Sequence, residues 1–426
     1  METIVALATA QGRAGVAVVR VSGPLAWTVC EALAGVVPAP RVARLLVLRD
    51  ASGDRIDQGL VLVFEEGRSF TGERVCEFQV HGSQAVVAAM LRACLTVKGV
   101  RAAEPGEYTR RAFFNGQLDL TEVEALADLI DAETEGQRKQ AMAVLDGSAG
   151  RLVDVWREDL LQALAILEAA MDFSDEELPE DLTPLALAPL ERVNASITAQ
   201  LSGRVASESV RDGFDVAIIG RVNTGKSTLL NTLAGREAAI TSERAGTTRD
   251  VIEVRMDIGG LAVTLVDTAG LRDTDDEIER LGIDRGQARA RDADLRVYLR
   301  EGPDDLPIGM EPDDIAVFSK SDLSGLPGVS GATGDGIPAL IRSIEHVLRE
   351  KTKGSSVFMR ERHFDKLMRA TDDLGRAITG LIAVPSAWEI VSDDVRSAIR
   401  CLDGIVGRVD IEDVLGRIFS SFCIGK

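Results

Sequence analysis

The sequence predicts a multidomain chain that combines two α/β domains with an all-helical domain. Three observations support this fold class. Short apolar strands alternate with turn signals in residues 1–117 and again in residues 211–354. Apolar residues recur at helical spacing in residues 118–210 and 355–426. A length of 426 residues is typical of about two to four domains, a range that includes the three indicated here.

The first α/β domain is expected to span residues 1–117. A β-hairpin is predicted from Leu45 to Phe64 around Gly53-Asp54, and an Ala/Leu-rich helix from about Gln84 to Val97. Met1 to Ile4 has no basic region of the kind found in signal peptides, so we expect it to begin the first strand.

The helical residues are expected to form one discontinuous domain. In the first stretch, 118–210, the spacing of three to four is carried by Val123, Leu126, Ala127, Ile130, Val153, Trp156, Leu160, Leu164 and Leu167. The pattern returns from about Phe358 to Phe419, within the second stretch, 355–426. We therefore expect residues 211–354 to be a module inserted between two parts of one helical domain, because the termini of a domain usually lie close together.

Composition narrows the class of protein. A hydrophobic content of 45% with 27% charged residues is ordinary for a globular protein, and the 4% of aromatic residues predicts aliphatic cores. The chain has no run of about eighteen apolar residues, so a membrane-spanning helix is not expected. The cysteines form no Cys-x-x-Cys pair and there are only three histidines, which argues against zinc and disulfides and predicts a reducing cytoplasm. The cysteines are Cys30, Cys76, Cys94, Cys401 and Cys423.

The most informative motif is Gly220-Arg221-Val222-Asn223-Thr224-Gly225-Lys226-Ser227, which fits the phosphate-binding pattern G-x-x-x-x-G-K-[ST]. It follows a predicted strand, Asp215–Ile219, and precedes a predicted helix, Thr228–Ala234. In that context, backbone N–H groups and a helix N-terminus converge on phosphates. Lys226 is expected to reach the β and γ phosphates, and the Ser227 hydroxyl to ligate Mg²⁺.

Two further segments follow in the order expected for a nucleoside triphosphatase. Gly246-Thr247-Thr248-Arg249-Asp250 and Asp267-Thr268-Ala269-Gly270 are separated by a predicted hairpin, whose strands turn at Gly259-Gly260. Such a hairpin would carry one segment to each side of a γ-phosphate. Thr248 is the candidate second Mg²⁺ ligand, Asp267 would hold Mg²⁺ through water, and the Gly270 N–H would sense the γ-phosphate.

The base is predicted to be guanine. Ser319-Lys320-Ser321-Asp322 follows an apolar strand and resembles the Asn-Lys-x-Asp element of GTPases, with Ser in place of Asn. A buried Asp322 carboxylate can accept hydrogen bonds from both N1–H and N2–H₂ of guanine, whereas adenine would leave it unpaired. The missing Asn is expected to loosen the base pocket without reversing its preference. Ser330-Gly331-Ala332 resembles the last guanine-side loop.

The group that orients the attacking water is not evident from the motifs. Many GTPases carry Gln directly after Asp-x-x-Gly, but this position is Leu271 here, which cannot orient water. The candidates are Arg272, Asp273 and the acidic run Asp275 to Glu279.

Together with both ends of the chain, these residues resemble the MnmE (TrmE) family of tRNA uridine-modifying GTPases over nearly the whole length. The marks outside the nucleotide motifs are Ile4-Val5-Ala6, Gly15–Ser22, Phe70-Thr71-Gly72-Glu73, His81-Gly82, Pro105-Gly106-Glu107-Tyr108, Arg111-Ala112-Phe113, Leu118-Asp119-Leu120, Asp128–Ala132 and Phe419–Lys426.

The resemblance implies a homodimeric, K⁺-stimulated GTP hydrolase with Mg²⁺ that forms a heterotetramer with the flavoprotein MnmG (GidA). Together they would modify C5 of the wobble uridine of certain tRNAs by a carboxymethylaminomethyl-type reaction. The one-carbon unit would come from a tetrahydrofolate derivative, 5-formyl- or methylene-tetrahydrofolate. The N-terminal domain would bind folate and dimerise, and the inserted module would be a Ras-like P-loop GTPase domain.

The resemblance also implies roles for residues of the nucleotide site. Potassium ligands would come from Asn223, Ser242, Arg244 and Thr247, and Glu279 would orient the water. The full set of residues expected to contact GTP is Asn223, Thr224, Gly225, Lys226, Ser227, Thr228, Ser242, Glu243, Arg244, Ala245, Gly246, Thr247, Thr248, Asp267, Thr268, Ala269, Gly270, Ser319, Lys320 and Asp322.

In the N-terminal domain, the resemblance implies a folate pocket that includes Arg20, Glu77 and Gln117. The residues alone favour a simpler interpretation of Arg20 and Glu77, as charges that alternate outward from apolar strands. The family commonly has Lys where Gln117 stands. The tail is implied to lie near this domain, with Lys426 approaching the ligand. Cys423 is either a nucleophile or acid–base group, or a small buried residue, which is the usual case.

Two alternatives to the modification enzyme remain at this stage. One is a GTP-driven switch in ribosome assembly or translation without modification chemistry, and the other is a membrane-remodelling GTPase, for which the chain lacks a basic amphipathic anchor. The net charge of −20 is unfavourable for tRNA binding. A short basic cluster, Arg360, Arg362, Lys366 and Arg369, is more typical of an exposed helix face, so weak tRNA binding by the chain alone is expected.

Overall fold

The computed structural model describes residues 2–172, 182–221, 223–236, 239–240, 253–267, 292–305, 307, 309–383, 388–409, 415, 418–419, 422 and 425. Contacts divide the chain into two compact units, residues 1–127 with 403–426, and residues 128–402. The four-part division expected from the sequence stays a prediction.

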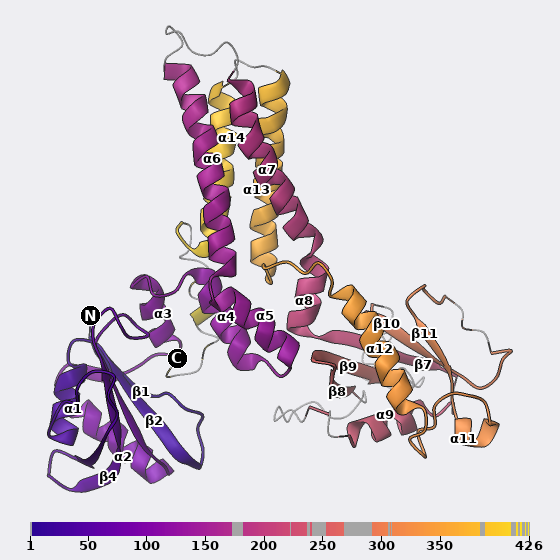
Figure 1. The fold of residues 1–426 in the computed structure, drawn as a ribbon. Helices are drawn as coiled ribbons and strands as arrows, with labels where there is room; N and C mark the ends of the chain where they lie inside the picture. Colours follow the sequence, from indigo (N-terminus) through magenta and orange to yellow (C-terminus); the bar gives the residue numbers. More distant parts are fainter. Residues whose placement is uncertain are drawn as a thin grey trace, which may run out of the picture. The chain divides into compact units, whose positions relative to one another are not determined.

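The N-terminal unit contains a six-stranded sheet in the order β3-β4-β5-β2-β1-β6 (Figure 1). Its neighbours pair antiparallel except for β1 and β6, which are parallel. The strands are β1 (Thr3–Leu7), β2 (Ala14–Ser22), β3 (Arg44–Arg49), β4 (Arg55–Phe64), β5 (Val75–Gly82) and β6 (Val100–Ala102). The predicted first strand and the predicted hairpin, formed by β3 and β4, are confirmed.

Helices cover this sheet because its strands alternate in polarity. Val19, Val61 and Phe78 are fully buried against α1 (Ala26–Ala34) and α2 (Gln84–Leu95). The Ser83 hydroxyl caps α2 by accepting a hydrogen bond from Val86 N at 3.2 Å, so the predicted helix begins where expected. The shorter α3 (Glu107–Phe114) contributes Tyr108 to a separate small core with Ile4.

A buried ion-pair network joins α3 to the sheet. Arg101 binds the Glu107 carboxylate through both guanidinium branches, at 2.8 and 2.6 Å, and Arg111 binds it at 2.9 Å. Arg111 also reaches Glu73, at 2.9 Å. Glu107 is only 2% exposed, so its charge is tolerated because these partners surround it.

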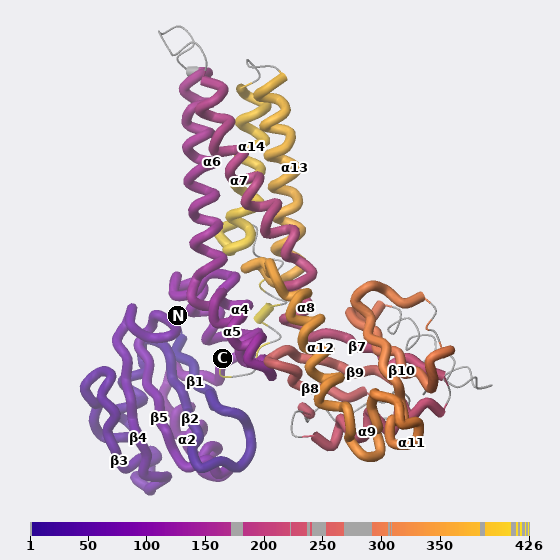
Figure 2. The backbone as a smooth tube through the Cα atoms, turned by 45° about the vertical axis from the view of Figure 1, so that its right-hand side comes forward, coloured from indigo at the N-terminus to yellow at the C-terminus, as the bar shows by residue number. Residues whose placement is uncertain are grey.

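The second unit contains a bundle of four long helices, α6, α7, α13 and α14, which run side by side (Figure 2). Trp156 of α6 stacks on Phe358, which precedes α13, with ring centroids 5.8 Å apart, and Arg396 of α14 binds Glu168 of α6 at 2.7 Å. Helices from before and after the inserted sheet therefore pack together. The helices of this unit are α5 (Glu135–Leu145), α6 (Ser148–Asp172), α7 (Thr183–Ser202), α8 (Arg204–Asp212), α13 (Glu361–Ala383) and α14 (Trp388–Val406), whereas most of α4 (Leu120–Asp131) belongs to the N-terminal unit.

The inserted sheet has five strands in the order β11-β10-β7-β9-β8. Only β8 and β9 pair antiparallel, through the predicted hairpin that turns at Gly259-Gly260. The strands are β7 (Phe214–Gly220), β8 (Glu253–Ile258), β9 (Leu261–Asp267), β10 (Leu295–Arg300) and β11 (Ile315–Phe318), with helices α9 (Lys226–Ala234), α11 (Ser321–Ser324) and α12 (Ile337–Lys351).

The predicted fold class is confirmed: an N-terminal α/β domain, a discontinuous helical domain and an inserted α/β module. Tail residues that the structure describes lie within the N-terminal unit, where Phe419 and Phe422 pack with Val123 and Gly425 lies against Leu7. Within the described part of the chain, none of the helices combines the length and apolarity needed to cross a bilayer.

We expect Glu107→Gln to destabilise the N-terminal unit by about 2 kcal/mol, because it removes the buried carboxylate that Arg101 and Arg111 share and leaves them only Glu2 and Glu73 as charged partners. Unfolding can be followed by Trp27 fluorescence in a chain whose other two tryptophans, Trp156 and Trp388, are replaced by Phe. Glu104→Gln is the matched control. Its pair with Arg110 is exposed and should contribute at most about 1 kcal/mol.

The same variant should remove a pH dependence. Burial alone would raise the pKa of Glu107, but hydrogen bonds from Arg101, Glu104 N and Arg111 outweigh it and lower the pKa from 4.5 to about 2. Because the folded pKa is the lower one, this stabilisation is present above pH 4.5 and is lost as the pH falls towards 2. Equal acid sensitivity of Glu107→Gln and the parent chain would contradict this account.

Candidate functional site

The phosphate-binding loop lies where the sequence predicts it, between β7 and α9. Asn223 adopts a positive φ of 66° and Gly225 one of 90°, so the loop curls back on itself before α9 begins at Lys226. The Thr224 hydroxyl donates to Arg221 O at 2.8 Å and holds the curl closed. The free N–H groups at the start of α9 make this loop a site for anions.

Three of the predicted residues meet beside this loop. The Ser227 hydroxyl donates to the Asp267 carboxylate at 2.9 Å, which joins the start of α9 to the end of β9. The Lys226 ammonium is 4% exposed and donates to the carbonyls of Gly220 and Arg221, both at 2.7 Å. Burial lowers the pKa of Lys226, and the charge of Asp267 opposes that shift.

A cavity of about 160 Å³ lies next to the loop, at the carboxyl ends of the parallel strands. Thr224, Gly225 and Thr228 line one side, and Ser319, Lys320 and Asp322 line another. The structure therefore brings the phosphate-binding loop and the base-recognition element to one cavity. Its remaining walls include Leu229, Leu299, Val329 and the loop Ser330-Gly331-Ala332.

The last of these loops approaches α9 closely. A Cβ built on Gly331 would lie 2.8 Å from Leu229 N, so only glycine allows this contact. The Ser330 hydroxyl accepts hydrogen bonds from the N–H groups of Ala332 and Thr333 at 3.2 and 3.1 Å, which fixes the loop against the cavity. The weakest of the guanine-side matches thus lines the same cavity as the stronger one.

Two details of the base-recognition element differ from expectation. Asp322 is exposed at the cavity, whereas a buried carboxylate is expected from the sequence. The reason is that α11 is a single turn after β11, which lies at the edge of the described sheet, so that among the described residues no further element buries Asp322. Ser319, which stands where many GTPases have Asn, is 3% exposed. Its hydroxyl donates to Arg300 O at 3.2 Å and is therefore bonded to the protein backbone.

Several predicted site residues lie outside the described residues. They are Ser242, Glu243, Arg244, Ala245, Gly246, Thr247, Thr248, Thr268, Ala269, Gly270, Glu279, Cys423 and Lys426, and Leu271 and the other candidates for orienting water lie there too. Of the proposed potassium ligands the structure places only Asn223, whose side chain is exposed on the loop.

Arg20 and Glu77 form an ion pair in the N-terminal unit. They are directly paired across β2 and β5, with Arg20 Nε 2.8 Å from Glu77 Oε1. Their side chains are 23% and 15% exposed, so neither simply extends into solvent. The Arg20 guanidinium lies 5.8 Å from the Phe70 ring centroid and 5.7 Å from that of Tyr108. Neither aromatic residue is among the expected site residues, although both belong to the motifs quoted above.

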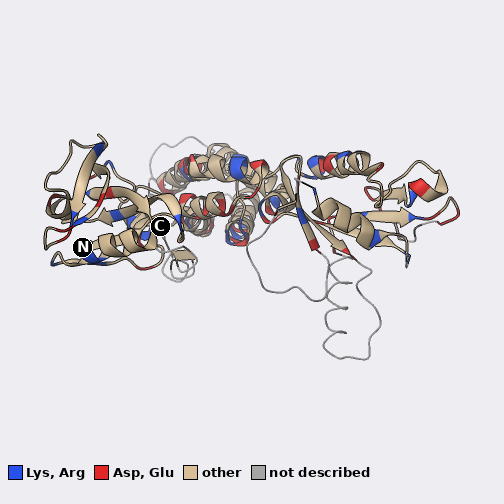
Figure 3. Ribbon diagram, turned by 90° about the horizontal axis from the view of Figure 1, so that it is seen from below, with Lys and Arg blue, Asp and Glu red and all other residues tan. Residues whose placement is uncertain are grey.

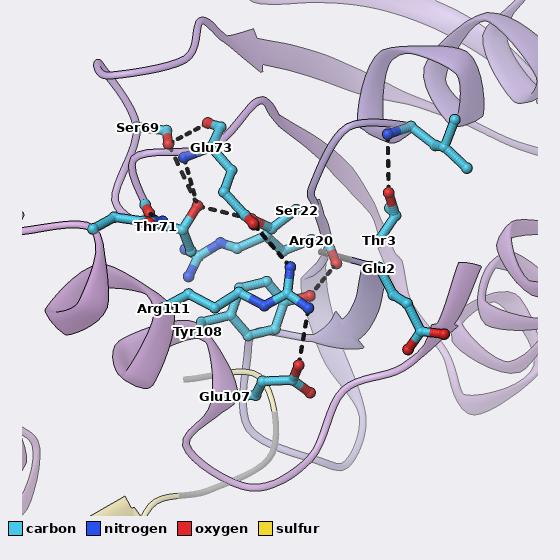
Figure 4. Close-up of polar contacts among 12 residues, drawn as sticks. Glu2, Thr3, Arg20, Ser22, Ser69, Thr71, Glu73, Glu107, Tyr108 and Arg111 are labelled. Carbon is cyan, nitrogen blue, oxygen red and sulfur yellow. Dashed lines mark hydrogen bonds and ion pairs between the residues drawn. The ribbon is translucent and has the colours of Figure 1, made fainter. Parts of the chain in front are cut away.

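The motifs of this domain converge beneath Arg20 (Figure 4). The Glu73 carboxylate accepts from Ser22 Oγ at 2.7 Å and from Arg111 at 2.9 Å, and Thr71 Oγ1 lies 2.7 Å from Ser22 Oγ. The Tyr108 hydroxyl donates to Arg20 O at 2.6 Å. Segments far apart in the sequence therefore build one polar network that fixes the backbone of Arg20.

Gln117 is exposed and lies against the turn that follows Phe70. A Cβ built on Gly72 would meet Gln117 Cγ at 3.2 Å, and Asn115 Nδ2 donates to Thr71 O at 2.6 Å. Gln117 therefore lies beside the segment Phe70–Gly72, and the Phe70 ring in turn contacts the Arg20 guanidinium.

A second cavity in this unit is not expected from the sequence. It has a volume of about 450 Å³ and a mainly apolar wall from β1, β6 and α2, with Thr9, Gln11 and Gln84 as polar members. Gly425 of the tail lies against Leu7, one of its lining residues. No sequence signal predicts it, because apolar residues of a strand and a helix are equally consistent with a filled core.

Comparison with known proteins agrees with this arrangement. The model of the MnmE helical domain matches residues 120–423, and that of the GTP-binding protein TrmE N-terminus matches residues 3–117. Similar proteins include the tRNA modification GTPases MnmE of Roseobacter denitrificans, 52% identical over 430 residues, and of Ruegeria pomeroyi, 51% identical over 428 residues. Both alignments cover 100% of this chain and 100% of the relative.

A solved G domain of the T. maritima FeoB iron transporter aligns with 32% of this chain and 98% of its own at 20% identity, with a TM-score of 0.21, too low to bear on the fold. The two family matches and the full-length relatives decide the assignment. With its phosphate-binding loop and base cavity in one module and the TrmE-like domain before it, the chain belongs to the MnmE family of tRNA modification GTPases.

Proposed function

We propose that this chain hydrolyses GTP with Mg²⁺ and K⁺ to drive a tetrahydrofolate-dependent modification at C5 of the wobble uridine of certain tRNAs. It would act as a homodimer in a heterotetramer with MnmG (GidA), in a reducing cytoplasm. The observation that carries the proposal is the full-length similarity to MnmE proteins together with the Ser227–Asp267 contact beside the phosphate-binding loop.

The residues beside the loop fit a magnesium ion. Ser227 and Asp267 offer a hydroxyl and a carboxylate, the oxygen donors that Mg²⁺ prefers, and their oxygens are 2.9 Å apart. When bound there with GTP, Mg²⁺ neutralises charge on the β and γ phosphates. Lys226 would release its two carbonyl partners and turn to those phosphates, and Thr248 and the Gly270 N–H would complete the site.

Base selection rests on the 160 Å³ cavity. Asp322 at its edge would accept hydrogen bonds from both guanine N–H groups, and the base itself would then cover this exposed carboxylate. Leu299 and Val329 would contact the flat faces of the ring. The Ser319 hydroxyl is already bonded to Arg300 O. Discrimination between guanine and adenine would therefore depend on the Asp322 carboxylate.

Hydrolysis requires a group that balances charge developing on the phosphates and a group that orients water. A potassium ion held by Asn223, Ser242, Arg244 and Thr247 would supply the first. For the second role, which Leu271 cannot fill, we propose Glu279, the residue that the resemblance to the family implies. The positive φ of Asn223 turns this residue outward on the phosphate-binding loop, a position compatible with a cation beside the phosphates.

The Arg20 environment has the chemistry of a pterin site. A pterin ring carries adjacent donors and acceptors on one edge, which Glu77 and Arg20 can match, and flat faces that suit Phe70 and Tyr108. Tetrahydrofolate bound there would supply the one-carbon unit. Gln117 provides an amide in place of the family's Lys. The location of Gly425 in the same unit supports Lys426 and Cys423 as residues that approach the ligand.

The charge distribution supports shared binding of tRNA. Lys and Arg alternate with Asp and Glu along the helices and strands of the view in Figure 3, and many of these cations are already paired with acids. Since phosphate binding depends on free Lys and Arg, we infer that MnmG contributes much of the tRNA-binding surface.

We expect Glu279→Ala to leave GTP affinity nearly intact and to lower kcat by about a hundredfold or more, because only the orientation of water is lost. Single-turnover hydrolysis and equilibrium binding of a fluorescent GTP analogue separate these effects. Glu158→Ala, the same change at an exposed glutamate of α6, is the control and should hydrolyse GTP normally. Near-normal turnover of Glu279→Ala would remove Glu279 from this role.

Replacement of K⁺ by Na⁺ at equal ionic strength should slow GTP hydrolysis by about tenfold or more, since the smaller ion fits the same oxygens poorly. Asn223→Ala should hydrolyse GTP slowly in both salts and show little difference between them. An unchanged rate of the parent chain in Na⁺ would count against Asn223 as a cation ligand.

Titration calorimetry with 5-formyltetrahydrofolate tests the proposed chemistry. The parent chain should bind it, and Arg20→Ala should weaken binding by about tenfold or more, because a hydrogen bond to a charged group is lost. Arg74→Ala is the control, since Arg74 stacks on Trp27 elsewhere in the domain. Absence of binding by the parent chain would favour a GTP-driven assembly or translation switch.

A further inference from the structure

Helix α5 contacts the hairpin that carries Asp267. Its second residue, Gly136, donates its N–H to Gly260 O in the β8–β9 turn at 2.8 Å. This N–H is one of the groups that a helix N-terminus leaves without an intrahelical partner, so the hairpin completes the cap of α5. A Cβ built on Gly136 would lie 2.5 Å from that oxygen, so the backbones meet directly and leave no room for a side chain.

An ion pair reinforces this contact. Glu133, which precedes α5, binds Arg255 of β8 with Oε2 2.9 Å from Nε. The turn is held from another element too, because Arg349 of α12 donates to Gly259 O at 2.8 Å. The β8–β9 turn is therefore held both by α5 of the helical domain and by α12 of its own module.

The same helix also contacts α8, the helix that precedes β7 and the phosphate-binding loop. Gln137 Nε2 donates to Arg211 O at 2.9 Å and Gln140 Nε2 donates to Ser207 O at 3.1 Å, both in α8. α8 leads through Gly213 directly into β7, the strand before the phosphate-binding loop. α5 thus binds both the segment that leads to Ser227 and the hairpin that ends at Asp267.

We propose that α5 is a positioning element for the Ser227–Asp267 pair, through which the helical domain sets the geometry of the magnesium site. The inference rests on the proposed magnesium role of that pair. A two-stranded ladder from Ile258↔Leu261 to Glu253↔Val266 connects the turn to Asp267. Because β9 rises about 3.4 Å per residue, a shift at the turn acts on Asp267 across roughly 20 Å of stiff strand.

The test is Gly136→Ala in the full-length protein. The added methyl group must separate the turn from α5, so Asp267 should move relative to Ser227. We expect kcat for GTP hydrolysis to fall about tenfold with KM for GTP changed less than about twofold, because misplacement affects the transition state most. Binding of fluorescent GDP should also need about fivefold more Mg²⁺, a readout that does not depend on turnover.

Gly375→Ala is the matched control. It is the same substitution within a long helix of the bundle, and a Cβ there meets nothing within 4 Å. It should leave kcat and the Mg²⁺ requirement unchanged. Wild-type values for Gly136→Ala in a folded protein would overturn the proposal.

A charge swap keeps the proposal testable if Gly136→Ala does not fold. Glu133→Lys places a like charge against Arg255 and should lower kcat about threefold, and Glu133→Lys with Arg255→Glu should restore it. An unaffected Glu133→Lys, or a swap that restores nothing, would overturn the proposal. Ser227→Ala separates a failure of the α5 proposal from a failure of the magnesium site on which it rests. If Ser227→Ala leaves hydrolysis and its Mg²⁺ dependence intact, the proposed magnesium site itself is wrong.

Discussion

The nucleotide site depends on the register between β7 and β9. These parallel neighbours pair Ile218 with Asp267, so the last residue of β9 lies at the same sheet edge as the loop that follows β7. That register alone brings Asp267 within 2.9 Å of Ser227, a residue forty positions away in the sequence. A slip of one residue would direct Asp267 to the opposite face of the sheet and leave the phosphate-binding loop without its carboxylate.

The sequence predicts the features of this site that local chemistry decides. The phosphate-binding loop, the Gly259-Gly260 turn and the helix that begins at Gln84 depend on residues within a few positions of one another, and each is found where expected. Exposure of Asp322 could not be predicted in this way, because it depends on whether another element covers the single turn α11. The same holds for Ser319, whose hydroxyl bonds a carbonyl of the neighbouring strand β10.

The N-terminal domain shows a different limit. Arg20 and Glu77 each interrupt an apolar strand, and from either strand alone an outward orientation is the simpler interpretation. The direct pairing of β2 with β5 changes this, because it gives each charge a partner 2.8 Å away and lets both be partly buried. Glu73 behaves likewise, since only the tertiary fold brings it to Arg111, whereas Glu107 and Arg111 already pair within α3. Residues that mark the family in different segments therefore act together through contacts that the fold creates.

Helix α5 bears on how hydrolysis could act beyond the nucleotide site. The chain enters the inserted module at β7 and leaves it after α12, and covalent connections of this kind would by themselves permit a hinge. The Gly136–Gly260 and Glu133–Arg255 contacts add an attachment at the hairpin, so the module cannot turn without moving α5 or breaking them. Coupling of this kind is reciprocal in free energy. If contacts of α5 favour one position of Asp267, then a change in the position of Asp267 on hydrolysis alters the stability of those contacts by the same free energy. The GTPase reaction would thereby act on the helical domain through α5.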